Sequence, residues 1–252
     1  MSRSLALDTA AWSSPWRHRS VADKAVLTLA LLATTLLLPV WPTAALSAAA
    51  ALIVLLGPAR LAPTVLARSL RSPLLFIVLG AASVLVSVSW HDGPRVAITA
   101  QTSTQALTVL GRGVAGTLCV FVLAATTPMV DLLAGLRRAR VPEACVEVAS
   151  LVYRLLFVLL DTTRRIREAQ AARLGLRDRR TTLRSAGTLS GTLLVRAWGR
   201  ARRLEEGLAG RGYTGALPSL DPPGRVSIGF LGATVALVGV IVVVSLLGAG
   251  PR

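Results

Sequence analysis

Long stretches without charged residues constrain this chain more than any other feature of its sequence. The 23 residues of Val226–Gly248 carry no charge, and neither do the 18 residues of Pro73–Trp90. A helix of about 20 apolar residues spans the hydrocarbon core of a bilayer, so both runs are candidate membrane spans. Because a bilayer offers the backbone no hydrogen-bond partners, such runs favour helices. The sequence predicts an all-α polytopic membrane protein.

Three further apolar runs complete the predicted set of spans. Ala25–Val40 and Thr43–Gly57 are short, and the prolines Pro39 and Pro42 between them predict a transmembrane hairpin. Gln105–Thr127 is the fourth span along the chain, and Val226–Gly248 is the last. With Pro73–Trp90 as the third, the count is about five.

One charge, Arg112, lies in the middle of the fourth span. An intramembrane charge is costly and faces the interior of a helix bundle. Arg112 is therefore predicted to be a structural charge, paired either with an acid such as Asp131 or with a backbone carbonyl. Gly111, Gly113 and Gly116 beside it are small enough to permit close helix packing.

The charge distribution predicts which side of the membrane each segment occupies. The chain has a net charge of +16, and residues 137–211 hold 17 arginines against seven acids. Positive residues favour the cytoplasmic side, which places this block, the basic N-terminal lead and the loop carrying Arg60, Arg68 and Arg71 inside. If Ala144–Leu160 crossed the membrane, the arginines that follow it would lie outside. This segment is instead expected to be the buried part of a long helix that dips into the membrane or lies along it, and the C-terminus is expected outside.

These assignments divide the chain into three parts. Residues 1–127 form a cytosolic lead and four transmembrane helices, residues 128–215 form cytosolic or interfacial helices, and residues 224–252 form the C-terminal transmembrane helix. Within the middle part, one helix is expected to stop at Gly175. A second is expected from about Thr182 to Ala209, stopping at Gly210 and Gly212.

No catalytic or metal-binding motif stands out in the sequence. A phosphate-binding loop and the common hydrolase and zinc-protease signatures are absent. The two cysteines and two histidines are too scattered for a metal site. We therefore expect a protein that is not an enzyme and binds no cofactor directly. A membrane-embedded lipid-modifying enzyme is an alternative, although Glu143 and Glu147 are the only acids spaced four residues apart. Nucleic acid is not expected as a partner, because few aromatic residues accompany the arginines.

Two similar motifs close the two helices of the Arg-rich block. The first is Ala172-Arg173-Leu174-Gly175 and the second is Ala209-Gly210-Arg211-Gly212-Tyr213. The small residue would let a partner backbone approach, and the arginine offers five donors to carboxylates or carbonyls. Glycine would end the helix in a left-handed conformation. The alternative is that arginine and glycine simply end each helix, since the helix dipole favours a cation there.

The chain resembles the transmembrane T component of energy-coupling factor transporters, most closely the CbiQ group of cobalt transporters. The resemblance covers nearly the whole chain, and the second helix-closing motif is its more specific signal. Two departures are Leu174, inserted before the glycine of the first motif, and Gly210, inserted before the arginine of the second. The residues that carry it are Leu7-Asp8, Ala11-Trp12, Trp16 and Lys24 in the lead, Arg112, Thr126-Thr127-Pro128, Asp131-Leu132-Leu133, Val141-Pro142, Tyr153-Arg154 and the two motifs.

This resemblance implies a coupling subunit of an importer in the cell membrane of a prokaryote. Two ATP-binding cassette ATPase subunits would dock on Ala172, Arg173, Gly175, Ala209, Arg211 and Gly212. Those partners would use the ATP, and a separate small membrane protein would bind the substrate. Cobalt is favoured by the likeness of the N-terminal lead, and nickel or a vitamin remains open.

Overall fold

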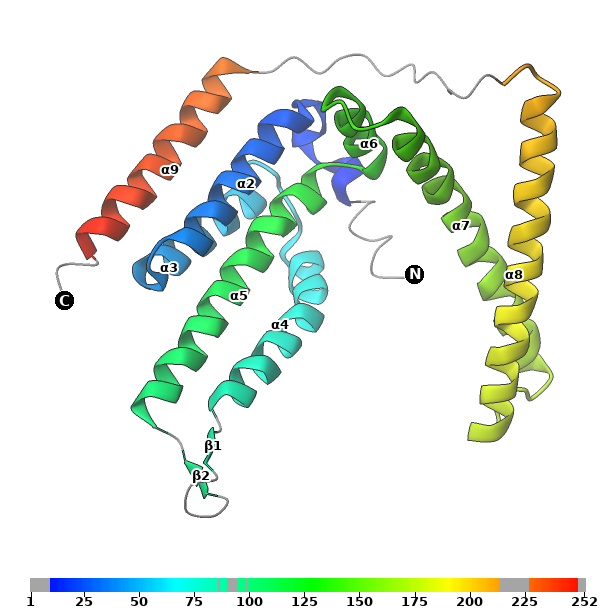
Figure 1. Ribbon diagram of the computed structural model, residues 1–252, viewed down its shortest axis with the longest axis horizontal. Helices are drawn as coiled ribbons and strands as arrows, with labels where there is room; N and C mark the ends of the chain where they lie inside the picture. Colours follow the sequence, from blue (N-terminus) through cyan, green and yellow to red (C-terminus); the bar gives the residue numbers. More distant parts are fainter. Residues whose placement is uncertain (1–9, 86, 90–94, 98, 214–226, 249–252) are drawn as a thin grey trace. The chain divides into compact units, whose positions relative to one another are not determined.

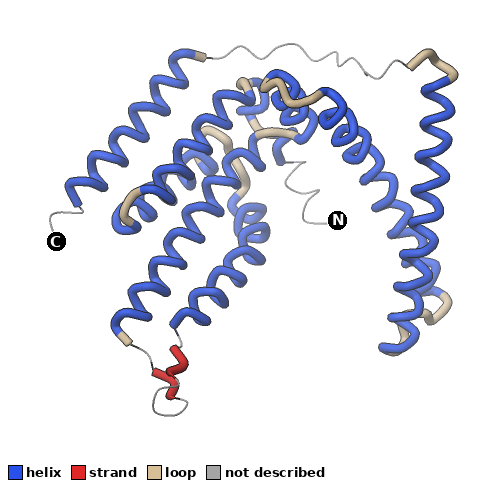
Figure 2. Tube along the Cα trace, in the orientation of Figure 1, coloured by secondary structure: helices blue, strands red, loops and turns tan. Residues whose placement is uncertain are grey.

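The computed structural model describes residues 10–85, 87–89, 95–97, 99–213 and 227–248, and within them it is almost entirely helical (Figures 1 and 2). The prediction of an all-α membrane protein is confirmed, with one small addition. Two three-residue strands pair antiparallel between α4 and α5, with Val88 opposite Val96. The elements are η1 (Pro15–His18), α2 (Val21–Leu37), α3 (Val40–Leu56), α4 (Pro63–Leu85), β1 (Ser87–Ser89), β2 (Arg95–Ala97), α5 (Ala100–Thr126), α6 (Met129–Arg138), α7 (Glu143–Ala172), α8 (Arg179–Ala209) and α9 (Ile228–Gly248).

The chain divides into two compact units. The first runs to Leu132 and includes α9, and the second runs from Leu133 through α8. In the first unit α5 packs against α2, α3 and α4, while α9 packs against α2 and α3. Buried apolar side chains from these helices form one core, which includes Leu27, Leu31, Ala51, Leu55, Leu66, Leu118, Cys119, Val122 and Ile241.

Small residues allow the helices of this unit to approach closely. A Cβ atom added at Gly113 would lie 2.9 Å from Cγ2 of Ile77 on α4. One added at Gly111 would lie 3.5 Å from Ala44 and Trp41 on α3. Glycines at such contacts let helices pack by van der Waals interactions inside a membrane, where lipid removes the hydrophobic drive to associate.

The predicted spans agree with the helices in type and differ in their bounds. Among the described residues, α4, α5 and α9 are long and apolar enough to cross a membrane. The helices α2 and α3 have 17 residues each, so the count of five spans remains a prediction. α9 begins at Ile228, and Val226 and Trp90 lie outside the described residues.

The start of the third predicted span was wrong. The helix α4 begins at Pro63 and continues through Pro73, so Arg68 and Arg71 lie on a helix and not in a loop. A proline removes one backbone hydrogen bond and usually ends or kinks a helix. Membrane helices tolerate it because neighbouring groups satisfy the freed carbonyl.

The second unit is built from α7 and α8, which pack against each other. One continuous helix covers Ala144–Leu160 and everything up to Ala172, as expected. Within the protein itself only Val146 and Glu147 on this helix are buried, so the expectation that Ala144–Leu160 dips into the membrane or lies along it remains a prediction. Val148, Val152 and Leu156 instead form an exposed stripe, since residues four apart share one face of a helix.

The start of α8 is fixed by a reciprocal cap that the sequence analysis did not identify. The Thr181 backbone N–H donates to the Asp178 carboxylate at 2.8 Å, and the Asp178 N–H donates to the Thr181 hydroxyl at 3.1 Å. This capping box satisfies orphan donors in the first turn. The Thr181 N–H, by bonding the charged form, also lowers the pKa of the Asp178 carboxyl. The helix therefore begins at Arg179 and not at Thr182.

Candidate functional site

The first motif closes α7 with a Schellman cap. The Leu174 N–H donates to the Ala171 carbonyl at 3.0 Å, and the Gly175 N–H donates to the Gln170 carbonyl at 2.8 Å. Leu174, with a φ of 58°, takes the left-handed position between them. This pair of bonds satisfies two carbonyls of the last helical turn. Arg173 is the residue at which the helix ends.

The second motif closes α8 with the same cap. The Gly212 N–H donates to the Ala209 carbonyl at 3.2 Å, and the Tyr213 N–H donates to the Leu208 carbonyl at 3.1 Å. Gly212, with a φ of 70°, takes the left-handed position. Gly210 keeps a right-handed helical conformation, so the helix extends slightly past Ala209.

Aligning the two caps by their hydrogen bonds brings the two arginines to the same position. Arg173 and Arg211 each directly precede the left-handed residue, which is Leu174 in one cap and Gly212 in the other. The small residue before the arginine is then Ala172 in the first motif and Gly210 in the second. The apparent insertions in the two sequences thus disappear in the structure, and Ala209 corresponds to Ala171.

The role expected for Gly175 was wrong. It does not take the left-handed conformation, which Leu174 adopts in its place. A Cβ atom at Gly175 would lie 2.7 Å from the Ser185 hydroxyl oxygen and 3.0 Å from the Gln170 carbonyl oxygen. This glycine is required because α8 approaches it closely. The Ser185 hydroxyl donates to the Gly175 carbonyl at 2.8 Å across that contact.

Both arginine side chains of the caps point to solvent. Arg173 and Arg211 are exposed, and within the described residues neither makes an ion pair or a hydrogen bond through its guanidinium. Ala172, Ala209 and Gly212 are exposed as well. Two fixed backbone turns therefore present two unpaired guanidinium groups.

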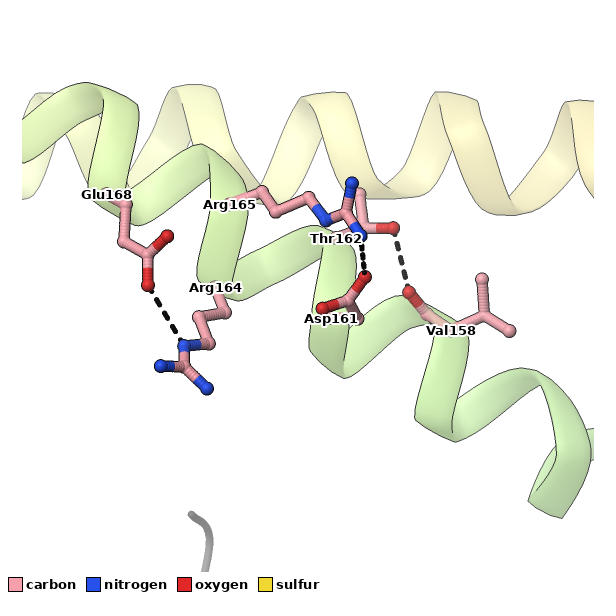
Figure 3. Close-up of polar contacts among 6 residues, drawn as sticks. All are labelled: Val158, Asp161, Thr162, Arg164, Arg165 and Glu168. Atoms are coloured by element: carbon pink, nitrogen blue, oxygen red, sulfur yellow. Dashed lines mark hydrogen bonds and ion pairs between the residues drawn. The ribbon is translucent and has the colours of Figure 1, made fainter.

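Other arginines of α7 are engaged within their own helix (Figure 3). Arg164 contacts Glu168 at 2.9 Å, and Arg165 contacts Asp161 at 2.9 Å. The Thr162 hydroxyl donates to the Val158 carbonyl beside them. Pairs four residues apart on an exposed helix face contribute about 0.3–0.5 kcal/mol each. These arginines support the helix locally, in contrast to the two at the caps.

Arg112 binds a backbone carbonyl, one of the two partners that the sequence left open. Its Nη2 atom donates to the Leu38 carbonyl at 3.4 Å, and Leu38 is the residue that ends α2. The other candidate, Asp131, lies 3.9 Å from Arg17. The last carbonyls of a helix lack partners within it and carry partial negative charge. Arg112 thus caps α2 from the middle of α5.

Two buried charges at the other end of α2 were not identified from the sequence as functional. Lys24 is fully buried, and its Nζ atom donates to the Thr126 carbonyl at the end of α5 at 2.9 Å. Asp23 is 1% exposed and accepts from the Ser227 N–H, which precedes α9, at 3.1 Å. The adjacent Asp23-Lys24 pair at the start of an apolar run was the signal available in the sequence. Lys24 and Asp23 each hydrogen-bond a backbone group at the end of another helix, as Arg112 does.

The outer face of α8 is apolar and exposed in this unit. Leu194, Val195 and Trp198 are 70–72% exposed, and Leu183 on the same helix is 76% exposed. Gly187 and Gly191 on this helix have open space where a Cβ would be. Exposed large apolar groups on one helix face indicate a surface for a partner protein or for lipid.

Comparison with known proteins gives a consistent family assignment. Residues 13–222 match the family model of the cobalt transport protein CbiQ. A cobalt transport protein CbiQ from Rhodobacter capsulatus is 37% identical over 241 residues, which cover 96% of this chain and 98% of that protein.

Two archaeal proteins are also similar. An uncharacterized protein of Methanocaldococcus jannaschii is 33% identical over 125 residues, which cover 50% of this chain and 47% of that protein. A protein of Methanocorpusculum labreanum, described as a fused cobalt transport protein CbiMQ, is 29% identical over 234 residues. That match covers 88% of this chain and 38% of the fused protein.

Proposed function

This chain belongs to the CbiQ family of cobalt transport proteins, and from that premise we propose that it is the coupling subunit of an energy-coupling factor importer. In this role it is a membrane scaffold without catalytic activity of its own. Two ATP-binding cassette ATPase subunits bind its α7–α8 unit and use the ATP. The chain itself binds no cofactor and lies in the cell membrane of a prokaryote.

The observation that carries the proposal is the repeated cap. Two successive helices end in the same hydrogen-bonded turn, and each turn exposes an unpaired arginine at the same position. A repeated element suits two copies of one partner. An arginine fork binds carboxylates or helix-end carbonyls in two-pronged fashion, so each ATPase subunit would offer such acceptors.

The exposed residues beside each arginine extend the docking site. Ala172 and Ala209, like Gly212, leave room for a partner backbone close to the guanidinium. Next to the first cap lies an open depression of about 520 Å³, whose lining includes Leu176, Leu183 and Ala186. A partner side chain seated there would bury apolar surface beside the charged contact.

The separate membrane subunit is the second partner in this proposal. The apolar face of α8 around Leu194 and Trp198 is suited to it, since that face is not covered within its own unit. The relative described as a fused CbiMQ supports an adjacent membrane protein, because its name joins a second part to a CbiQ-like part. That subunit, and not this chain, would capture cobalt. Nickel or a vitamin would be taken by the same arrangement with a different substrate-binding subunit.

The test combines partner binding with transport. Arg173→Ala, Arg211→Ala and the double variant are compared with Arg200→Ala, which removes an exposed arginine of α8 away from both caps. A charged hydrogen bond contributes about 1.5–3 kcal/mol, so each cap variant should weaken ATPase-subunit binding roughly ten-fold or more. Lysine should substitute poorly, because it lacks the two-pronged geometry.

The readouts are co-purification of the ATPase subunits and uptake of radioactive Co²⁺ and Ni²⁺ at matched membrane expression. The proposal predicts that both readouts fall for the cap variants and not for Arg200→Ala. If the double variant binds its partners and transports like the parent protein, the arginines only end their helices and the docking assignment fails.

A further inference from the structure

The relative placement of α7 and α8 depends on polar contacts at their two ends. None of the described residues of α8 is fully buried, and its apolar contact with α7 comes from half-buried side chains such as Leu189 and Leu193. At the connection, the Gln170 side-chain amide donates to the Ser185 carbonyl at 2.9 Å, alongside the Ser185–Gly175 bond. At the opposite end, the Tyr213 hydroxyl donates to the Glu147 carboxylate.

Glu147 is a buried acid on a helix that is otherwise largely exposed. Its side chain is 4% exposed, although it lies on a helix that buries only one other residue, Val146. Burying a carboxylate is costly unless it receives hydrogen bonds. The Tyr213 hydroxyl supplies one from the far end of α8. The carboxylate in turn raises the pKa of the Tyr213 phenol, since it favours the protonated donor.

Tyr213 bonds both helices of the second unit, α8 through its backbone and α7 through its side chain. Tyr213 lies two residues beyond Arg211. Its backbone N–H donates to the Leu208 carbonyl and so closes the cap of α8. Its hydroxyl reaches Glu147 near the start of α7. One residue therefore closes the cap of α8 and bonds α7.

We propose that Glu147 is a positioning residue, which holds the Arg211 cap against α7 through the Tyr213 hydroxyl and so fixes where Arg211 lies relative to Arg173. The inference deepens the proposed docking function and rests on it. Two partner subunits that close together require two contact points at a set separation. With the contact broken, the hydrogen bonds at the Gly175 end still join α8 to α7, and the Arg211 cap should take a wider range of positions.

The experiment measures the position of the cap directly. Spin labels are placed at Val152 on α7 and Glu205 on α8, which are both exposed, after both cysteines have been replaced by alanine. Pulsed electron spin resonance then gives the distance distribution in the full-length protein. Tyr213→Phe removes the hydroxyl and keeps the ring and the backbone N–H, so the distribution should broaden. The control, Thr188→Ala, removes an α8 hydroxyl that bonds only within its own helix, and it should leave the distribution unchanged.

Binding of the ATPase subunits is measured on the same variants. Loss of one charged hydrogen bond at the contact corresponds to about a ten-fold weaker affinity for Tyr213→Phe and for Glu147→Leu. Glu147→Gln keeps an acceptor for the phenol and should restore both the narrow distribution and the affinity to within about three-fold. A purely structural role for burial at this site would not distinguish glutamine from leucine in this way.

The outcomes separate this inference from the proposed function. If Tyr213→Phe leaves the distribution narrow while Arg211→Ala abolishes partner binding, the positioning role is overturned and the docking function stands. If Tyr213→Phe broadens the distribution while Arg211→Ala binds normally, Glu147 positions the cap and the docking function fails.

Discussion

The two units of this chain differ in which charged residues they bury: among the described residues the first unit buries Asp23 and the cation Lys24, whereas the second buries the acid Glu147 and no cation. In the first unit Asp23, Lys24 and Arg112 lie inside or partly inside the helix bundle, and each bonds the backbone at the end of another helix. In the second unit Arg164, Arg165 and Arg202 lie on the surface and pair with acids of their own helices. The cap arginines Arg173 and Arg211 are exposed, and neither makes an ion pair or a guanidinium hydrogen bond among the described residues.

The two units also differ in their apolar cores. The helices α2, α3 and α5 bury Leu31, Leu55 and Val122 in one shared core, and the outside of this unit exposes apolar side chains such as Phe76 at 81%, as expected of helices that face lipid. No described residue of α8 is fully buried, and Leu194 and Trp198 are 70% and 72% exposed. The second unit therefore presents apolar side chains outward on the same helices that carry its exposed arginines. A segment of the second kind is expected at a binding surface, because a partner can satisfy what the chain does not.

The largest effect should come from removing a buried cation of the first unit. Lys24→Met leaves the Thr126 carbonyl buried without its donor, which should destabilise the fold by about 3 kcal/mol. The measurement is denaturant unfolding of the purified protein in detergent. Arg71→Met, which removes an exposed arginine of α4, is the matched control and should stay near the parent. Equal stability of the two variants would mean that the buried charges do not hold the bundle.

A smaller effect is expected at a helix contact in the same unit. Gly113→Ala forces a methyl group to within 2.9 Å of Ile77, and such overpacking costs about 1–3 kcal/mol. Gly80→Ala on α4 meets nothing within 4 Å and should be neutral or slightly stabilising. The comparison is of thermal unfolding midpoints of the two variants. If the unfolding midpoint fell for both variants, or for neither, α4 and α5 would not pack as closely as described.

A glycine-to-alanine substitution in the second unit should raise the free energy of unfolding instead of lowering it. Gly187→Ala on α8 meets nothing within 4 Å, so it should stabilise the helix by about 1 kcal/mol through the higher helix propensity of alanine. Helix content and unfolding of the protein without its partners provide the measurement. A destabilisation would contradict the open face of α8 and would mean that another part of the chain packs there.

The smallest effect is expected for the ion pairs of α7. Asp161→Asn breaks its contact with Arg165, and both side chains are more than half exposed. Exposed pairs of this kind contribute no more than about 0.5 kcal/mol, and salt screens them. Unfolding measured at low and high ionic strength should show a slight difference that salt removes. A large, salt-independent loss would indicate that this face of α7 is buried and would weaken the contrast between the units.

Sequence reasoning recovered the elements better than their contacts. The apolar runs gave the approximate ranges of α2, α3, α5 and α9, and the arginine block gave two long helices. The start of α4 was misplaced, because the run without charges begins at Pro73 whereas the helix begins at Pro63 and includes Arg68 and Arg71. Sequence reasoning also assigned the left-handed turn to Gly175, because glycine favours that conformation, whereas Leu174 adopts it.

The sequence by itself determined that this chain is a helical membrane protein with an Arg-rich part, since hydrophobicity, charge and helix signals act over neighbouring residues. It also drew attention to Arg112, Arg173 and Arg211. Only the tertiary structure decided that Arg173 and Arg211 hold equivalent positions, that Arg112 and Lys24 serve the ends of distant helices, and that Tyr213 reaches Glu147. The contacts of Arg112, Lys24 and Tyr213 join residues far apart in the chain, so no local pattern encodes them, and packing selects among the partners that the sequence leaves open.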